Sequence, residues 1–230
     1  MLADLLDRLE ARYGAPSHEG PTEPFRLLVW LNCGYPASDA ACARGFAAVE
    51  AAIGVAPGAI LAEDTATLTD ALQAGGMIAE QRAERLKVIA RRVSEEFGGD
   101  LAAALTGPVA ASRRRLAGFP TIGEAAADRI LLFCGLSPLA VAPAGALQVP
   151  LRLGYGVEVR DWGKTYRSVR DALEAELPAE FAPRQRAYLL LKAHGQATCK
   201  RAAPVCRECP LTDDCRYFQQ VVAPAALSPG

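Results

Sequence analysis

Apolar residues recur at intervals of three and four along nearly the whole chain, which is the spacing that places side chains on one face of an α-helix. One face of the first predicted helix carries Leu2, Leu5, Leu6 and Leu9. This helix stops before residues 14–24, a segment rich in Pro and Gly. No segment shows the period of two that marks a half-buried strand. The chain is therefore predicted to be all-α.

Further helices are predicted from the same spacing combined with capping and helix-breaking residues. A short helix starts at Phe25 and is broken at 32–36, and Ser38 or Asp39 can cap the next one. The expected ranges are then 38–53, 67–74, 78–97, 108–117, 124–133, 145–153, 165–177 and 183–195. Residues 54–64 are expected to form a loop, and the tail after Tyr217 is expected to be flexible.

With 230 residues, 51% of them hydrophobic, the chain can build one large or two small domains with real cores. Its most apolar stretches, 27–33 and 130–136, are too short to cross a bilayer, so no membrane association is expected. The opening segment is acidic and amphipathic, unlike a secretory signal, which favours a cytoplasmic location.

The net charge is only −1, but the charged residues are unevenly distributed between the two halves of the chain. Residues 1–112 carry 9 Lys and Arg against 15 Asp and Glu, whereas residues 113–230 carry 16 against 11. The basic half includes the run Arg113-Arg114-Arg115. This half could meet a polyanion or simply form a solvated surface, and charge alone leaves both interpretations open.

Four cysteines near the C-terminus are separated by six, two and five residues, a spacing that predicts a metal centre. They are Cys199, Cys206, Cys209 and Cys215. Four thiolates suit either a tetrahedral zinc ion or a 4Fe-4S cluster, which takes one thiolate per iron. Only one short C-x2-C hook is present and the flanking gaps are wide, so an iron-sulfur cluster is favoured over zinc or disulfides. The other three cysteines are scattered along the chain.

Residues 116–123 lie between two helical patterns and form a predicted tight turn that ends in Gly123. Such a turn at a helix start exposes backbone N–H groups that can hold a phosphate oxygen. An ordinary connection between two helices would have the same local pattern.

A hairpin of this kind followed by C-x6-C-x2-C-x5-C resembles the endonuclease III family of DNA glycosylases. Residues 194–215 are similar to that family's segment H-G-x-x-x-C-x6-C-x2-C-P-x4-C. Residues 25–31 are similar to its entry helix F-E-L-L-V-A-x, and residues 82–86 to its K-A-x-x-I. The resemblance covers roughly residues 1–217.

The resemblance implies a two-lobed helix-hairpin-helix DNA glycosylase fold. A six-helix barrel domain would span 25–135 and end in the hairpin, and a discontinuous cluster domain would combine 1–24 with 136–217. Residues 218–230 would be a flexible tail. The family implies a 4Fe-4S cluster on the four cysteines and double-stranded DNA as partner, bound between the lobes. We expect a monomer, associated with the nucleoid in a bacterium.

The resemblance also points to DNA contacts in three segments. The hairpin would contribute Phe119, Pro120, Thr121, Ile122 and Gly123, the loop after the first barrel helix Tyr35 and Pro36, and the cluster loop Lys200, Arg201 and Arg207. The family's loop reads S-A-Q and fills the space left by a flipped nucleotide with glutamine. Pro36 cannot hydrogen-bond an orphaned base, but Tyr35 could stack on one or enter the duplex. The alternative for Tyr35 is that its ring packs inside the barrel. Separately, Met77 or Ile78 lies near the position of the residue that the family uses as a second wedge.

The family's catalytic positions are occupied by other residues in this chain. Ala125 stands where the hairpin lysine would attack the sugar, and a methyl group cannot be a nucleophile. With the register fixed by Val149 and 152–154, Pro143 stands at the position of the catalytic aspartate. Gly145 and Gln148 replace the histidine and arginine that follow it.

We therefore expect a DNA-binding protein of base excision repair type whose standard glycosylase and AP-lyase chemistry is weak or absent. The alternative is an active DNA N-glycosylase that uses a relocated carboxylate, for which Glu124, Asp128 and Asp161 are candidates. Asp128 is expected to pair with neighbouring arginines and Asp161 to form a turn. A third interpretation is a redox or interaction protein without DNA binding. His194 is expected to pack beside the cysteines.

Overall fold

The computed structural model describes residues 1–36 and 38–224, and within this part all regular structure is helical. The only pairing of extended backbone in it is an isolated parallel bridge between Tyr35 and Gly76. The all-α prediction is confirmed. The chain divides into two compact units, one formed by Glu19–Leu136 and the other by Met1–His18 together with the chain from Ser137 onward.

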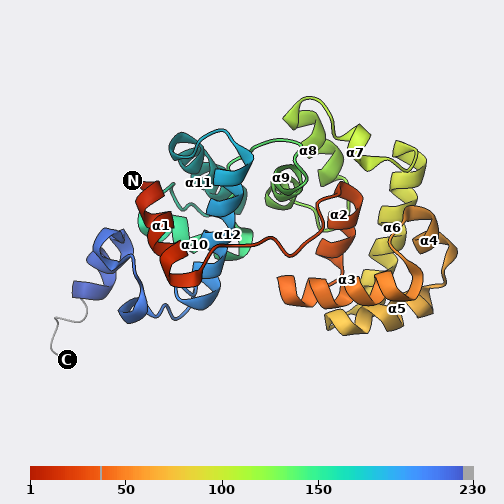
Figure 1. Cartoon of the computed structure of the whole chain (residues 1–230), viewed down its shortest axis with the longest axis horizontal. Helices are drawn as coiled ribbons and strands as arrows, with labels where there is room; N and C mark the ends of the chain where they lie inside the picture. Colours follow the sequence, from red (N-terminus) through yellow and green to blue (C-terminus); the bar gives the residue numbers. More distant parts are fainter. Residues whose placement is uncertain (37, 225–230) are drawn as a thin grey trace. The chain divides into compact units, whose positions relative to one another are not determined.

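The unit Glu19–Leu136 contains eight α-helices and one 3-10 turn within its described residues (Figure 1). They are α2 (Pro24–Asn32), α3 (Asp39–Ile53), α4 (Pro57–Ala62), α5 (Thr65–Leu72), the turn Gln73–Gly75, α6 (Ala79–Phe97), α7 (Leu101–Ala104), α8 (Val109–Ala117) and α9 (Glu124–Phe133). Helices α4 and α5 both pack on α6, and α3 packs on α5. The fully buried Trp30, Leu68 and Leu86 belong to its core.

Two short helices of this unit were not predicted. The segment 54–64, predicted as a loop, contains α4, which begins with Pro57 at its first turn and buries Ile60. Its Pro and Gly suggest a turn, but Pro is also favourable at the start of a helix because its missing N–H needs no partner there. Helix α7 has a single turn, which is too short to show a period.

The second unit contains α1 (Leu2–Tyr13), α10 (Gln148–Leu153), α11 (Trp162–Glu176) and α12 (Phe181–Ala197). The four leucines predicted on one face of α1 are buried, and α1 packs on α12. Arg186 of α12 donates to the carboxylates of Asp7 and Glu10, which joins the polar edges of the two helices. The remaining elements are the 3-10 turns Ala144–Ala146, Cys206–Glu208 and Thr212–Asp214 and the π-helix Phe218–Val222.

Two expectations differ from the structure in this unit. The predicted helix 145–153 is a 3-10 turn followed by α10, which starts at Gln148. The π-helix Phe218–Val222 lies where a flexible tail was expected, and the Gln219 N–H donates to the Cys215 carbonyl at 3.0 Å. The expectation for residues 225–230 lies outside the described residues.

Among the described residues, no helix combines the length and apolar character that crossing a membrane requires.

Candidate functional site

The hairpin between α8 and α9 buries its apolar side chains and exposes the others. Phe119 and Ile122 are only 3% and 5% exposed. The Phe119 ring lies 6.1 Å from that of Phe97, and the Arg92 guanidinium lies 4.9 Å from its centre. Thr121 and Gly123 are exposed. The buried pair therefore fixes the turn while its polar tip faces solvent.

The tip of the hairpin has an unusual backbone. Thr121 has a φ of 65°, a conformation that costs a non-glycine residue about 1–3 kcal/mol. Its hydroxyl donates to the side-chain carbonyl of the buried Asn32 at 2.9 Å, which stabilises this conformation. Gly123 is the N-cap of α9 and offers no side-chain acceptor to the first N–H groups of the helix. Such a helix start is suited to an anion.

The hairpin position at which the endonuclease III family has its nucleophilic lysine is occupied here by Ala125. Ala125 is buried in the first turn of α9, with 6% of its surface exposed. The only lysine in the sequence of Glu19–Leu136 is Lys87, and its ammonium donates to the carbonyls of Leu61 and Glu63 at the end of α4. The start of α9 therefore has uncapped N–H groups and no amine in the hairpin beside them.

Two of the three candidate carboxylates have structural roles, as expected for them. Asp128 is fully buried and pairs with Arg113 between the two helices of the hairpin. Asp161 caps α11 by accepting the Lys164 N–H at 2.8 Å. Glu124 is half-buried in the first turn of α9 and remains the candidate for relocated chemistry.

The segment that replaces the family's aspartate strip contains no acidic residue from 142 to 154. Pro143 is buried at the start of the 3-10 turn Ala144–Ala146. The Gln148 amide donates to the Cys199 carbonyl at 2.9 Å, so this side chain is tied to the cysteine segment.

Tyr35 and Met77 form an exposed apolar pair in the unit Glu19–Leu136. Tyr35 is 44% exposed and Met77 60%, so the packed alternative for Tyr35 is wrong. The Tyr35 N–H donates to the Gly75 carbonyl and the Met77 N–H to the Tyr35 carbonyl, both at 3.0 Å. Two loops about forty residues apart in sequence are thereby held side by side.

Arg82 fixes both loops from beneath, and sequence reasoning missed it. The residue is 1% exposed, and its guanidinium donates to the carbonyls of Met77, Leu72, Gly76 and Cys33. A side chain at Gly75 would overlap the Cys33 carbonyl, so the loops approach closely there. The signal in the sequence is a charged residue on the same helical face as Leu86 and Ile89, because such a charge must find polar partners inside.

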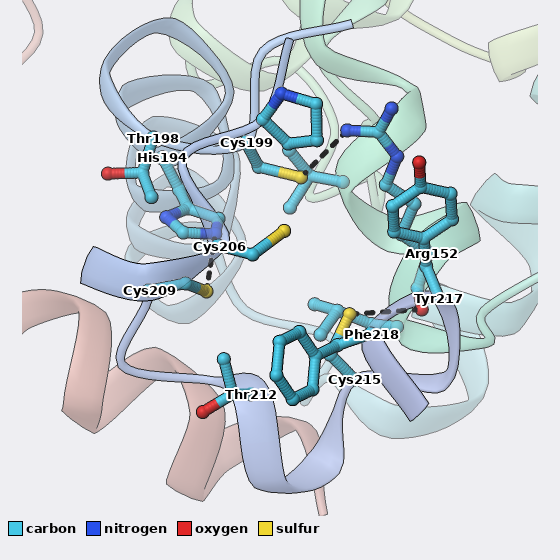
Figure 2. A pocket seen from close by; sticks show the side chains of 13 residues that line it. Arg152, His194, Thr198, Cys199, Cys206, Cys209, Thr212, Cys215, Tyr217 and Phe218 are labelled. Atoms are coloured by element: carbon cyan, nitrogen blue, oxygen red, sulfur yellow. Dashed lines mark hydrogen bonds between the residues drawn. The ribbon is translucent and has the colours of Figure 1, made fainter. Parts of the chain in front are cut away.

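The four C-terminal cysteines line one small cavity (Figure 2). The other lining residues are Val149, Arg152, Leu153, His194, Thr198, Pro204, Thr212, Tyr217 and Phe218. Within residues 1–36 and 38–224, no group of three or more Cys, His, Asp or Glu is arranged to hold a metal ion. The thiols therefore share a cavity without meeting as a single-ion site.

Hydrogen-bond donors face two of the four sulfur atoms, and the Cys215 thiol donates to the Arg152 carbonyl at 3.6 Å. An Arg152 Nη donates to Cys199 Sγ at 3.3 Å, and the Leu211 N–H donates to Cys209 Sγ at 3.4 Å. The Nε2 of His194 lies 3.6 Å from Cys209 Sγ (Figure 2). Burial raises the pKa of Cys199 and Cys209, while the donated hydrogen bonds act in the opposite direction. Burial is the larger effect and favours the protonated thiols, so a metal would be needed to keep these cysteines deprotonated.

His194 is a packed residue beside the cysteines, as expected. It is 2% exposed, and its Nδ1 is hydrogen-bonded to the Tyr13 hydroxyl at 2.9 Å. Burial lowers the pKa of His194 to about 4, so its imidazole is neutral at pH 7. The three basic residues expected to contact DNA on the cysteine loop are all exposed: Lys200, Arg201 and Arg207.

Comparisons with known proteins identify the fold. No model of a known protein family matches the chain, and no curated protein matches its sequence. An endonuclease III trapped in a covalent intermediate with DNA superposes with a TM-score of 0.74 at 19% identity, covering 95% of each chain. A thermostable thymine-DNA glycosylase gives 0.69 at 16% identity, covering 95% of this chain and 94% of that one. The 3-methyladenine DNA glycosylase of H. pylori gives 0.58 at 16%, covering 85% and 92%. The chain has the helix-hairpin-helix fold that these glycosylases share.

Proposed function

We propose that this protein binds double-stranded DNA in base excision repair without the standard glycosylase and AP-lyase reaction. The observation that carries the proposal is the state of the hairpin. The first N–H groups of α9 have no side-chain cap at Gly123, while the buried Ala125 supplies no nucleophile in the first turn of the helix. A phosphate would accept hydrogen bonds from the N–H groups at the start of α9, helped by the helix dipole.

The exposed pair Tyr35 and Met77 gives the same unit a wedge for the duplex. Apolar side chains inserted between base steps unstack them at a cost of a few kcal/mol, which is recovered when the bent DNA contacts more protein. Arg82 and the bridge between the loops hold the backbone of the two residues in place, so little backbone entropy is lost when their side chains insert. A phenol ring stacks on any base, so we expect little preference for the base opposite a lesion.

The cysteine cavity would hold a 4Fe-4S cluster through Cys199, Cys206, Cys209 and Cys215. The donor set fits in kind and number, because all four thiols line one cavity and N–H donors face two of the sulfurs. Such a cluster supplies cross-links that order a loop with little apolar content. Lys200, Arg201 and Arg207 would then meet phosphates. We also propose that the protein acts as a cytoplasmic monomer, associated with the nucleoid in a bacterium.

A substitution at Gly123 tests the duplex site. Gly123→Asp places a carboxylate at the N-cap of α9, where a side chain meets no neighbour within 4 Å. Asp is a better N-cap than Gly, so thermal stability should hold or rise slightly. Duplex affinity, measured by fluorescence anisotropy, should fall about tenfold because the carboxylate occupies the site and repels phosphate.

The matched control is Gly123→Asn, which caps α9 without a charge and should weaken binding less. Wild-type affinity should also fall steeply with salt as phosphate contacts release counterions. Equal duplex affinity in wild type and Gly123→Asp would overturn the proposed site.

The proposed absence of the standard glycosylase and AP-lyase reaction is tested independently of DNA binding. Incubation with an abasic-site duplex and borohydride should trap no covalent adduct, because no lysine lies in the hairpin. A panel of duplexes with oxidised or alkylated bases should release no base. Base release that is lost in Glu124→Gln would instead establish a relocated carboxylate and an active N-glycosylase.

A further inference from the structure

Two adjoining cavities open beside the loop 154–161, which connects α10 to α11 in the unit that carries the cysteines. Their volumes are about 490 and 440 Å³, within the range of ligand pockets. They share Gln148, Leu151, Glu158 and Arg201 in their walls, so they form one continuous groove. Neither the hairpin nor the Tyr35–Met77 pair belongs to it.

The groove carries an excess of positive charge. Arg160, Arg201 and Arg216 line it and are exposed, and none of them makes an ion pair within the described part of the chain. The one acidic residue in its walls is Glu158, which is also exposed. Three arginines without counterions around a hollow favour a ligand with more than one negative charge.

An aromatic platform lies at one end of the groove. The Trp162 indole stacks on the Tyr166 ring, with centres 5.4 Å apart and planes inclined by 9°. Tyr166 is fully buried, whereas Trp162 is 47% exposed and lines the cavity. One face of the indole is therefore covered by protein, and the ring is held flat with surface available to a planar ligand.

Arg152 forms the wall between this groove and the cysteine cavity. It donates to Cys199 Sγ and to the backbone carbonyls of Lys200 and Arg201, and its guanidinium lies 4.5 Å from the centre of the Tyr217 ring (Figure 2). Its donors are used within the protein, so Arg152 positions the Arg201 segment and leaves ligand contacts to the other arginines.

Gly154 allows another of these arginines to reach the groove. It has a φ of 94°, and a side chain there would overlap the Arg216 guanidinium and its last methylene group. The absence of a β-carbon thus leaves room for Arg216 to lie across the loop, where it lines the larger cavity.

We propose that this groove binds a single strand of DNA. A base would stack on Trp162, and the backbone phosphates would contact Arg160, Arg201 and Arg216. A basic groove combined with an exposed aromatic ring is how proteins hold single strands without reading sequence, because every base has a π-face and every linkage a charge. Glu158 repels phosphate and limits the affinity. The groove shares Arg201 with the proposed duplex contacts of the cysteine loop, but it includes no residue of the hairpin and does not depend on phosphate binding at Gly123.

The test uses a short oligothymidylate carrying a fluorophore and the full-length protein. Stacking is worth about 1–3 kcal/mol per base, so Trp162→Ala should weaken binding about tenfold in anisotropy titrations. The double variant Arg160→Gln with Arg201→Gln should weaken binding at least as much and reduce the salt dependence. Glu158→Gln should tighten binding severalfold.

Two further variants serve as controls. Arg91→Gln removes an exposed charge from α6 in the other unit and should leave the affinity unchanged. Trp162→Phe keeps an aromatic ring but should lose the quenching of tryptophan emission on binding, because the remaining Trp30 is buried.

The outcomes separate this site from the proposed duplex site. Gly123→Asp should lose duplex binding and keep oligothymidylate binding. Equal oligothymidylate affinity in wild type, Trp162→Ala and the double arginine variant would overturn the proposal, as would weakened binding in Glu158→Gln. Binding of oligouridylate alone, without oligothymidylate, would overturn the assignment to DNA, whereas comparable binding of both would support the stacking mode.

Discussion

At the residue scale, Arg82 shows how a single buried charge can organise two loops. Its four acceptors are backbone carbonyls, so no carboxylate partner fixes it. Burial lowers the pKa of Arg82, yet a guanidinium stays protonated in proteins. The five donors of its planar fork suit several acceptors at once, which the single ammonium of lysine cannot match.

Arg82→Met is therefore expected to destabilise the unit Glu19–Leu136 by about 3 kcal/mol or more, because each orphaned buried carbonyl costs about 1–3 kcal/mol. Urea unfolding followed by Trp30 emission in a Trp162→Phe background measures this unit. Arg91→Met, at an exposed site on the same helix, should cost little. Similar losses in the two variants would contradict the role assigned to Arg82.

The thiol of Cys134 is expected to make the stability of the folded protein depend on pH above about pH 9. Burial, with a smaller contribution from the charge of Glu23, raises the pKa of Cys134 from 9.0 to about 12. Between these pH values the unfolded state has lost the proton and the folded state keeps it, so unfolding becomes more favourable as the pH rises. The urea midpoint should fall above pH 9, and less steeply in Cys134→Ala. Part of the fall should remain because burial also raises the pKa of Cys33.

At the scale of elements, two glycines within helices show when close packing outweighs the intrinsic helix propensity of alanine. Gly45 lies within α3, and a side chain there would overlap the Cys33 carbonyl. Gly58 lies within α4, where a side chain would meet nothing within 4 Å. Alanine is favoured over glycine in a helix by roughly 1 kcal/mol, but backbone overlap reverses that gain.

Gly58→Ala is therefore expected to stabilise the protein by up to about 1 kcal/mol, and Gly45→Ala to destabilise it by about 1–3 kcal/mol. Thermal or urea unfolding of the two variants in parallel provides the measurement. Stabilisation by both would mean that α3 can move away from the Cys33 segment.

At the scale of the whole molecule, each of the two units has an apolar core of its own. The segment 199–215 of the second unit differs from both cores, because its only regular structure is short 3-10 turns. A cluster on its cysteines would replace the missing apolar burial with metal–ligand bonds.

Cys206→Ser should then abolish visible absorbance and lower the unfolding temperature reported by Trp162, while Trp30 reports little change. Cys134→Ser should keep the absorbance. If Cys206→Ser and wild type show the same spectrum and the same transition, the four cysteines hold no cluster.

The sequence by itself determined most of the helices and the hairpin, because periodicity and capping act over a few residues. The spacing of the leucines in α1 and the range 124–133 of α9 agree with the structure for this reason. The same local rules missed α4, since Pro57 and Gly58 occur in turns as well as at helix starts. The motif spacing also singled out the four cysteines that share a cavity.

Only the tertiary structure decided how distant segments meet. The bridge between Tyr35 and Gly76, the four carbonyls around Arg82 and the groove beside Trp162 each join residues that are far apart in the chain or carry no motif. Local patterns specify which face of a helix is buried, but the partner of that face depends on the packing of all the helices together. From the sequence alone, a charged residue such as Arg82 would therefore be predicted at the surface, because the carbonyls that surround it are known only from the structure.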